Sequence, residues 1–290
     1  MLAPSFSSPS APVSLDTPAV AAEAAANQTL LRRHHVRVLG EGKPAMVLCN
    51  GFGCSQQIWR HMIPTLAARY QLILFDYVGS GESDLSAYDE RKYATLAGYA
   101  QDVVDICQAL QLHDAVIVGH SVGAMIGLLA ATQAPRYFTK LVLIAPSPYY
   151  LNEPDYYGGF EVDDVHQLLA LMDEDYHSWT NLFASLLMGP ANPASLGEEL
   201  ATYFCQTDSA IAQQFARVVF LSDNRPDLAR LRQPALVLQC QQDVAAPAEV
   251  GAYLARHLPV ATLVTLNATG HCPHLSAPLE TLRAMEAFLA

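Results

Sequence analysis

The chain has 290 residues, of which 51% are hydrophobic, and its 16 basic and 28 acidic residues give a formal net charge of −12. This length accommodates one large α/β domain, and no apolar run approaches the roughly 18 to 20 residues that a membrane-spanning helix needs. Because nucleic acids and anionic membranes are bound through basic patches, the acidic balance argues against both as partners.

The first 28 residues are rich in Ala, Ser and Pro, and we expect them to form a disordered tail. They contain no Lys or Arg, and Glu23 interrupts their one apolar stretch, which is unlike a secretory signal. The six cysteines are scattered without a Cys-x-x-Cys pair, as is typical of reduced, buried thiols. These features predict a cytoplasmic protein.

From about Leu31 onward, short β-rich runs alternate with longer helical patterns. The runs predict strands at 35–39, 45–49, 71–75, 115–119, 140–145, 235–240 and 261–266. The helical patterns cover 55–70, 95–112, 122–133, 248–257 and 278–289. The inner strands are nearly continuous apolar runs, as in parallel strands buried on both faces. The alternation predicts an α/β fold with a mostly parallel, doubly wound sheet.

Residues 148–228 interrupt this rhythm, because they contain helical patterns and no convincing strand. A run of that length is too long for a loop, so we expect a helical cap inserted between core segments 29–147 and 229–290. Between Tyr149 and Phe220 lie 12 of the chain's 25 aromatic residues, and 11 acidic residues against one basic. As a group the rings are expected to line a pocket, although any single ring could equally pack on the core.

The strongest chemical signal is Gly119-His-Ser-Val-Gly123, framed by an apolar strand and a helix of small residues. A serine in such a strained turn is lifted out of the sheet, and flanking glycines avoid the clashes that Cβ atoms would cause. The pattern predicts Ser121 as a nucleophile. A cysteine nucleophile is the weaker alternative, since no base signature surrounds Cys54 or Cys272.

A serine nucleophile needs a base and a carboxylate. His271 follows the last predicted strand, at the edge of the sheet where Ser121 is expected, and Asp243 follows the strand before it. The order Ser121, Asp243, His271 matches the catalytic triads of α/β hydrolases. His274 is the rival base, but we expect it to face the final helix or solvent.

An oxyanion hole needs two backbone N–H donors. Val122 follows the serine and supplies one. Phe52 lies in the loop Asn50-Gly-Phe-Gly53 after an early strand, where glycines allow a ligand to approach the backbone, and is expected to supply the other.

Five segments together resemble the family of the bacterial sigma-B stress-response regulator RsbQ and the plant strigolactone and karrikin receptors. They are Asn50-Gly-Phe-Gly-Cys54, Phe75-Asp-Tyr-Val-Gly-Ser-Gly81, Gly119-His-Ser-Val-Gly-Ala-Met-Ile-Gly127, Leu151-Asn-Glu-Pro-Asp-Tyr-Tyr-Gly-Gly-Phe160 and Gly270-His-Cys-Pro-His274. The resemblance implies an α/β-hydrolase fold, a Ser-His-Asp triad and a closed hydrophobic pocket under a helical cap. It implies a pocket wall that includes Phe52, Trp179, Phe183 and Phe220.

Two hypotheses follow. In the first, the protein hydrolyses a small hydrophobic ester or lactone through an acyl-serine intermediate. In the second, it senses such a ligand and activates a protein partner, which the resemblance implies to be a stress-response phosphatase, with slow hydrolysis as the sensing event. No metal or organic cofactor is expected, since the chain lacks a ligand-spaced His/Cys/Asp cluster and a dinucleotide-binding loop.

Overall fold

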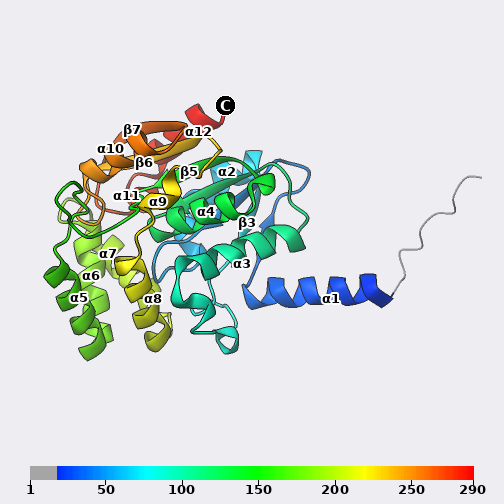
Figure 1. Cartoon of the computed structure of the whole chain (residues 1–290), viewed down its shortest axis with the longest axis horizontal. Coiled ribbons are helices and arrows are strands. Elements are labelled where there is room, and N and C mark those ends of the chain that lie inside the picture. The colour runs from blue at the N-terminus through cyan, green and yellow to red at the C-terminus, as the bar shows by residue number, and fades with distance from the viewer. Residues whose placement is uncertain (1–17) are drawn as a thin grey trace, which may run out of the picture.

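The computed structural model describes residues 18–290 and contains a seven-stranded sheet in the order β1-β3-β2-β4-β5-β6-β7 (Figure 1). The strands are β1 (Arg37–Leu39), β2 (Ala45–Cys49), β3 (Gln71–Leu74), β4 (Ala115–His120), β5 (Phe138–Ile144), β6 (Ala235–Gln242) and β7 (Ala261–Thr269). Only β1 pairs antiparallel, with β3, and every other neighbouring pair in this sheet is parallel. The expected α/β-hydrolase fold with its mostly parallel sheet is confirmed.

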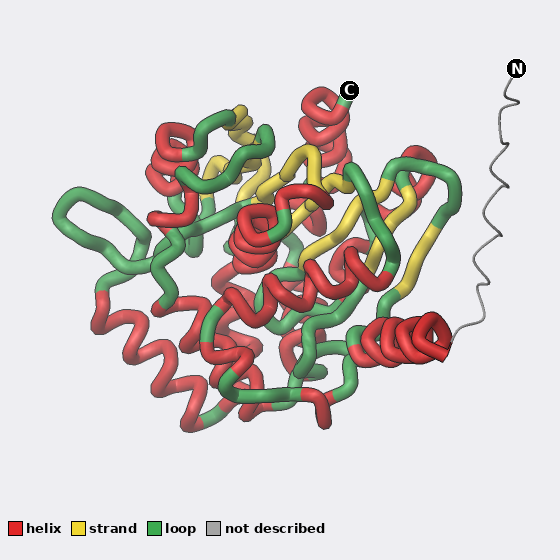
Figure 2. The backbone as a smooth tube through the Cα atoms, turned by 45° about the vertical axis from the view of Figure 1, so that its right-hand side comes forward, coloured by secondary structure: helices red, strands yellow, loops and turns green. Residues whose placement is uncertain are grey.

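Helices surround the sheet, as the tube in Figure 2 shows. They are α2 (Ile63–Arg69), α3 (Leu96–Ala109), α4 (Val122–Gln133), α10 (Ala248–His257), α11 (Pro273–Ser276) and α12 (Pro278–Leu289). Four short 3-10 turns lie at Gln56–Trp59, Leu85–Ala87, Lys92–Ala94 and Pro135–Tyr137. The helix predicted at 55–70 is therefore split. Pro64 occupies the first turn of α2, where its missing N–H costs nothing, so the regular helix begins only at Ile63.

The strand order reverses beside β2. From β2 the chain passes to β3 on one side, and it then crosses to β4 on the other side. Such a reversal opens a crevice at the carboxyl ends of the two diverging strands, which is where open α/β sheets bind ligands. Strand β4 is buried along its whole length, and ten of the twelve residues of α4 are buried behind it. The loops after β2 and β4 therefore meet on a rigid support.

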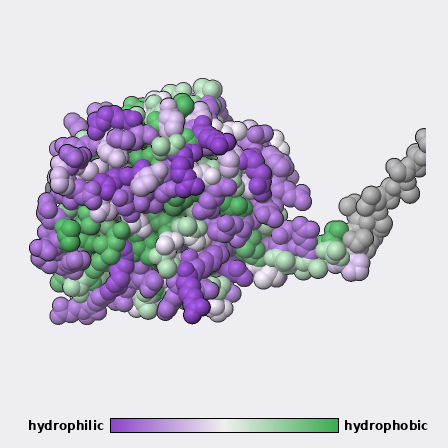
Figure 3. All heavy atoms as spheres, in the orientation of Figure 1, coloured by the Kyte–Doolittle hydropathy of each residue, from purple (hydrophilic) through white to green (hydrophobic). Residues whose placement is uncertain are grey.

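Residues 148–228 follow β5 and precede β6, and we refer to them as the helical insertion. They form α5 (Val162–Glu174), α6 (Tyr176–Met188), α7 (Ala194–Cys205), α8 (Ser209–Leu221) and α9 (Arg225–Leu228). Helices α5 to α8 lie together beside one end of the sheet (Figure 1). Their outer surface is partly apolar: Figure 3 shows hydrophobic atoms gathered on the left of the view, over α5 and α6, where Leu171, Leu182 and Leu186 are exposed.

Helix α1 (Pro18–Arg33) departs from the expected disordered tail, because residues 18–28 are helical. Residues 1–17 of that tail lie outside the described part of the chain. The helix has no buried residue and projects from the body in Figures 1 and 2. Six of its sixteen residues are alanine, the strongest helix former, which favours a helix although none of its residues is buried. Within residues 18–290, no helix is both long and apolar enough to cross a bilayer.

Candidate active site

Ser121 is the single residue between β4 and α4, and its backbone is strained, with φ 55° and ψ −125°. A non-glycine residue held at positive φ is a costly conformation that persists only where the surroundings impose it. Here the imposing contacts involve two glycines. A Cβ atom on Gly119 would lie 2.4 Å from the carbonyl oxygen of Gly123, and one on Gly123 would lie 2.3 Å from that of Asn50. Only glycine fits at these positions, which explains the sequence pattern around the serine.

The side chains of Ser121, His271 and Asp243 form a continuous hydrogen-bonded chain. His271 Nδ1 lies 2.8 Å from Asp243 Oδ2 and 3.0 Å from Oδ1, and His271 Nε2 lies 2.7 Å from Ser121 Oγ. Because a carboxylate can only accept, Nδ1 carries the proton of a neutral imidazole and Nε2 offers its lone pair to the serine hydroxyl. Asp243 Oδ1 also accepts hydrogen bonds from the backbone N–H groups of Ala245 and Ala246. This arrangement can transfer the serine proton to the imidazole.

The main chain of His271 is held at both of its polar groups. Its N–H donates to the carbonyl of Leu187, near the end of α6, at 2.7 Å. Its carbonyl lies 2.9 Å from Nε2 of His120, the residue before Ser121. The amide of Asn192 also joins α6 to the histidine loop, because its Nδ2 donates to the carbonyls of Met188 and Thr269. The helical insertion therefore positions the imidazole directly.

Of the two expected oxyanion-hole donors, Phe52 lies in the loop after β2 and Val122 is the first residue of α4. Neither Phe52 N–H nor Val122 N–H has a hydrogen-bond partner among residues 18–290, so both are free to meet a ligand oxygen. The loop after β2 is fixed by Asn50, whose amide donates to the carbonyl of Phe75 and accepts from Trp59 Nε1, both at 2.8 Å. An asparagine thus supports this loop where many α/β hydrolases have a histidine.

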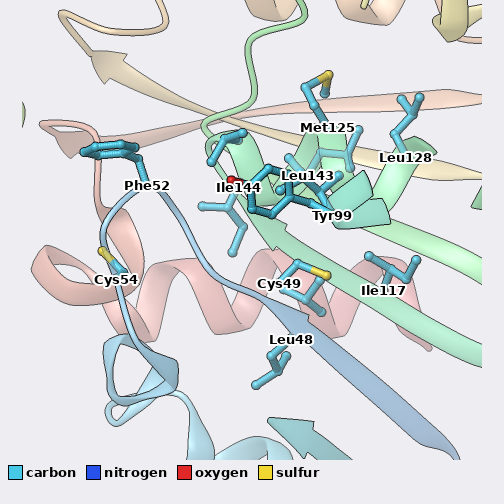
Figure 4. Close-up of a cluster of buried hydrophobic side chains, with 14 of the residues drawn as sticks. Leu48, Cys49, Phe52, Cys54, Tyr99, Ile117, Met125, Leu128, Leu143 and Ile144 are labelled. Carbon is cyan, nitrogen blue, oxygen red and sulfur yellow. The ribbon is translucent and has the colours of Figure 1, made fainter. Parts of the chain in front are cut away.

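A narrow pocket with a cavity volume of about 30 Å³ lies over the serine. Its lining is mostly apolar: Phe52, Cys54, His120, Ser121, Tyr150, Phe183, Leu187, Leu200, Phe204, Val219, Phe220, Ala245, His271 and Cys272. Figure 4 shows Phe52 and Cys54 on the loop after β2, beyond the buried Leu48 and Cys49.

Three of the four expected wall residues line this pocket, and Trp179 does not. Trp179 is buried and stacks on Phe183 with ring centroids 4.6 Å apart, and it meets the edge of Phe52 at 6.0 Å. It therefore supports the wall from behind. The reason is packing: two large rings one helical turn apart on α6 stack on each other, and only the inner one reaches the ligand space.

Sequence reasoning missed Tyr150, which joins the pocket from the start of the helical insertion. Burial raises the pKa of its hydroxyl to about 12, with the neighbouring Ser121 hydroxyl acting in the opposite direction. It therefore stays protonated near the serine. Cys54 and Cys272, noted beside the motifs, also line the pocket, and burial raises the pKa of both thiols far above the ordinary range. Protonated thiols are weak nucleophiles, which argues against the cysteine alternative.

His274, the rival base, was expected to face the final helix or solvent, and the structure excludes solvent. It is completely buried between Trp59, at 4.9 Å between ring centroids, and His120, at 4.4 Å. Burial, with the neighbouring His120 and His271, holds its pKa well below the usual value, so the ring stays neutral. Its burial depends on rings from distant parts of the chain, Trp59 and His120, and no sequence pattern distinguishes that from a ring at the surface. Within residues 18–290, no cluster of three or more His, Cys, Asp or Glu side chains could hold a metal ion.

A parallel sheet of this order, with hydrogen-bonded Ser, His and Asp side chains at its carboxyl edge, defines the class of α/β hydrolases. The chain belongs to the alpha/beta hydrolase family, whose model matches residues 46–284.

Known proteins similar to this chain include plant receptors and esterases. The chain is 38% identical to karrikin insensitive 2 receptor CA of Petunia hybrida, over 84% of this chain and 91% of that protein. It is also 38% identical to strigolactone esterase D14 of Arabidopsis thaliana, over 87% and 94% respectively. A solved hydrolase from Oleispira antarctica is 39% identical and superimposes with a TM-score of 0.89, over 91% of this chain and 97% of that one. The resemblance to the plant receptors is thereby confirmed.

Proposed function

We propose that the protein is a serine hydrolase that cleaves small hydrophobic esters or lactones through an acyl-Ser121 intermediate. The observation that carries this proposal is the unbroken chain of hydrogen bonds from Ser121 Oγ through His271 to Asp243. The relatives named as esterases support hydrolysis, and the apolar pocket supports the substrate class. The division into core and cap, and a cytoplasmic location, stay predictions.

The reaction would proceed in two halves. His271 Nε2 takes the proton of Ser121 while Oγ attacks the substrate carbonyl, and Asp243 stabilises the imidazolium that forms. The carbonyl oxygen, now an oxyanion, accepts hydrogen bonds from the free N–H groups of Phe52 and Val122. The imidazolium then gives its proton to the departing alkoxide, and the acyl group stays on Oγ. Water, deprotonated by His271, releases the acid in the second half.

The narrow pocket restricts the acyl group. Ligand sites for drug-sized molecules usually have several hundred Å³ of open space, whereas this pocket has a cavity volume of about 30 Å³. Aromatic side chains from three elements line the pocket and limit extension of the acyl chain: Phe52 after β2, Phe183 on α6 and Phe220 on α8. Short or compact acyl groups should therefore react fastest.

The test is hydrolysis of p-nitrophenyl acetate and p-nitrophenyl octanoate by the wild type and by Ser121→Ala. We expect the acetate to react faster in the wild type, and Ser121→Ala to lose at least about a thousandfold in kcat/KM. Intact-protein mass spectrometry should find an acetyl group on Ser121. The control is Ser178→Ala, an exposed serine on α6 that should leave the rate unchanged. Hydrolysis by Ser121→Ala at the wild-type rate would contradict the proposal.

The second candidate function is a ligand-sensing regulator of the RsbQ type, in which slow hydrolysis controls the binding of a signalling phosphatase. Two observations favour it. Relatives of this chain are named as receptors, and the outer face of α5 and α6 exposes Leu171, Leu182 and Leu186, with Leu182 61% exposed. Apolar side chains grouped on an otherwise acidic surface are typical of protein interfaces.

The regulator hypothesis is tested by pull-down from lysate of the native host, with and without Ser121→Ala, followed by identification of the captured proteins. A phosphatase that binds the wild type should be lost with Leu182→Asp combined with Leu186→Asp. It should be kept with Leu279→Asp, which changes an equally exposed leucine on α12. Capture of a phosphatase that none of these changes affects, or of no phosphatase, would count against this function.

A further inference from the structure

His120 touches all three parts of the candidate site. It directly precedes Ser121, and its Nε2 lies 2.9 Å from the carbonyl oxygen of His271. Its ring also lies against the loop after β2, where a Cβ atom on Gly51 would approach Nδ1 to 2.5 Å. The side chain is 3% exposed. One imidazole thus links the turn that carries the serine, the residue that carries the base and the loop that carries Phe52.

The direction of its hydrogen bond follows from the acceptor. A carbonyl oxygen has no proton to give, so His120 Nε2 must be the protonated nitrogen and the donor. The neutral ring then leaves a bare lone pair on Nδ1, which is buried and has no partner within residues 18–290. Burial and the nearby His271 lower the pKa of His120 to about 3, so the ring stays neutral while His271 gains and loses its proton.

The unpartnered Nδ1 makes this imidazole costly as a structural residue. Leaving a buried acceptor unsatisfied typically costs about 1 to 3 kcal/mol, and such atoms in native proteins call for an explanation. Gly51 lies against this nitrogen, where a Cβ atom on residue 51 would approach Nδ1 to 2.5 Å. Within residues 18–290, the ring makes one hydrogen bond, to the His271 carbonyl, and this bond accounts for a polar side chain at position 120.

We propose that His120 is a positioning residue, which fixes the main chain of His271 against the turn that carries Ser121. The proposal rests on the proposed serine hydrolysis. Leu187 holds the N–H of His271 and His120 holds its carbonyl, so the imidazole is fixed from the helical insertion and from the sheet at once. Without His120 the main chain of His271 loses one of its two anchors, and the imidazole is aligned less well with both Asp243 and Ser121 Oγ.

The test compares variants that keep and remove the donor. His120→Gln can still donate from a similar position, whereas His120→Leu has no donor and the amide of His120→Asn is too short. We expect His120→Leu and His120→Asn to lower kcat for p-nitrophenyl acetate about ten- to hundredfold, because small misplacements of a catalytic group cost this much. KM should stay within about twofold of the wild-type value. His120→Gln should keep most of the wild-type kcat. The matched control is His274→Leu, which removes a buried imidazole of the same stack that has no hydrogen bond.

Two further measurements keep the outcome clear. Thermal unfolding identifies any variant that fails to fold. If His120→Leu fails, the comparison uses His120→Asn, which keeps a polar side chain. The low-field NMR resonance of the proton on His271 Nδ1, which is hydrogen-bonded to Asp243, can be measured without substrate. It should weaken in His120→Leu and His120→Asn but not in His120→Gln. Folded Leu or Asn variants with wild-type kcat and an unchanged resonance would overturn the positioning role, as would an equal loss in His274→Leu. Absence of Ser121-dependent hydrolysis in the wild type would instead overturn the proposed function.

Discussion

At the scale of single residues, Asp243 determines which nitrogen of His271 carries the proton. Asp243→Asn keeps an oxygen that can accept from Ala245 and Ala246, but it turns an amide N–H₂ toward His271 Nδ1. The imidazole must then carry its proton on Nε2, where it cannot accept one from Ser121. We expect kcat to fall about a thousand- to ten-thousandfold, with the thermal midpoint almost unchanged. Steady-state hydrolysis of p-nitrophenyl acetate measures the loss.

The matched control for this change is Asp163→Asn, an exposed carboxylate in the first turn of α5. Asp163→Asn removes the same negative charge at a position outside the candidate site, so the variant should hydrolyse p-nitrophenyl acetate at the wild-type rate. If Asp243→Asn kept more than about a tenth of the wild-type kcat, the tautomer argument would be wrong.

The sequence could indicate residues whose role depends on position in a motif, and it could not indicate those whose role depends on packing. Ser121, Asp243 and His271 each follow a strand that ends at the same edge, so chain order alone brings them together. Tyr150 and Trp179 differ, because entry to the pocket depends on how the helices of the insertion stack. Tyr150 lines the pocket, whereas Trp179 lies behind its wall.

At the scale of elements, the inner strands were predictable because they are apolar runs bounded by polar residues. The strand at 45–49 and the helices at 122–133, 248–257 and 278–289 have their predicted bounds. The bounds that differ reflect local chemistry: Pro64 delays α2, and alanines extend a helix into the expected tail. The contact between α6 and the loop that carries His271 could not be predicted from the sequence. It joins main-chain atoms of Leu187 and His271, which leave no trace in side-chain patterns.

That contact gives the helical insertion a role beyond covering the pocket. The carbonyls of Leu187 and Met188 lie in the last turn of α6, where a helix leaves its carbonyls without internal partners. Here His271 N–H and the Asn192 amide satisfy them, so the end of the helix and the position of the base are one structural unit. Any movement of α6 caused by a ligand or by a partner must therefore move His271. This coupling connects the two candidate functions, since binding at the insertion would change catalysis.

At the scale of the whole molecule, the buried neutral histidines make stability depend on pH. The pKa of His120 is lowered to about 3 and that of His274 lies well below its usual value, both mainly through burial. In the unfolded chain both titrate near 6.5. Between these values the unfolded state binds more protons, so stability is complete above about pH 6.5 and is lost as the pH falls toward 3. Each histidine contributes up to about 1.4 kcal/mol per pH unit.

Urea unfolding at pH 7 and pH 5 tests this dependence, in a range where most carboxylates stay ionised. We expect the wild type to lose about 2 kcal/mol through His120 between pH 7 and pH 5, and His274 should add to this loss. His274→Leu removes one titrating group from the buried stack without removing a hydrogen bond. Its free energy of unfolding should therefore fall less steeply, by about one histidine's share, whatever its stability at pH 7. Equal slopes in the two proteins would show that His274 is protonated in the folded state, and the neutral stack behind His271 would have to be abandoned.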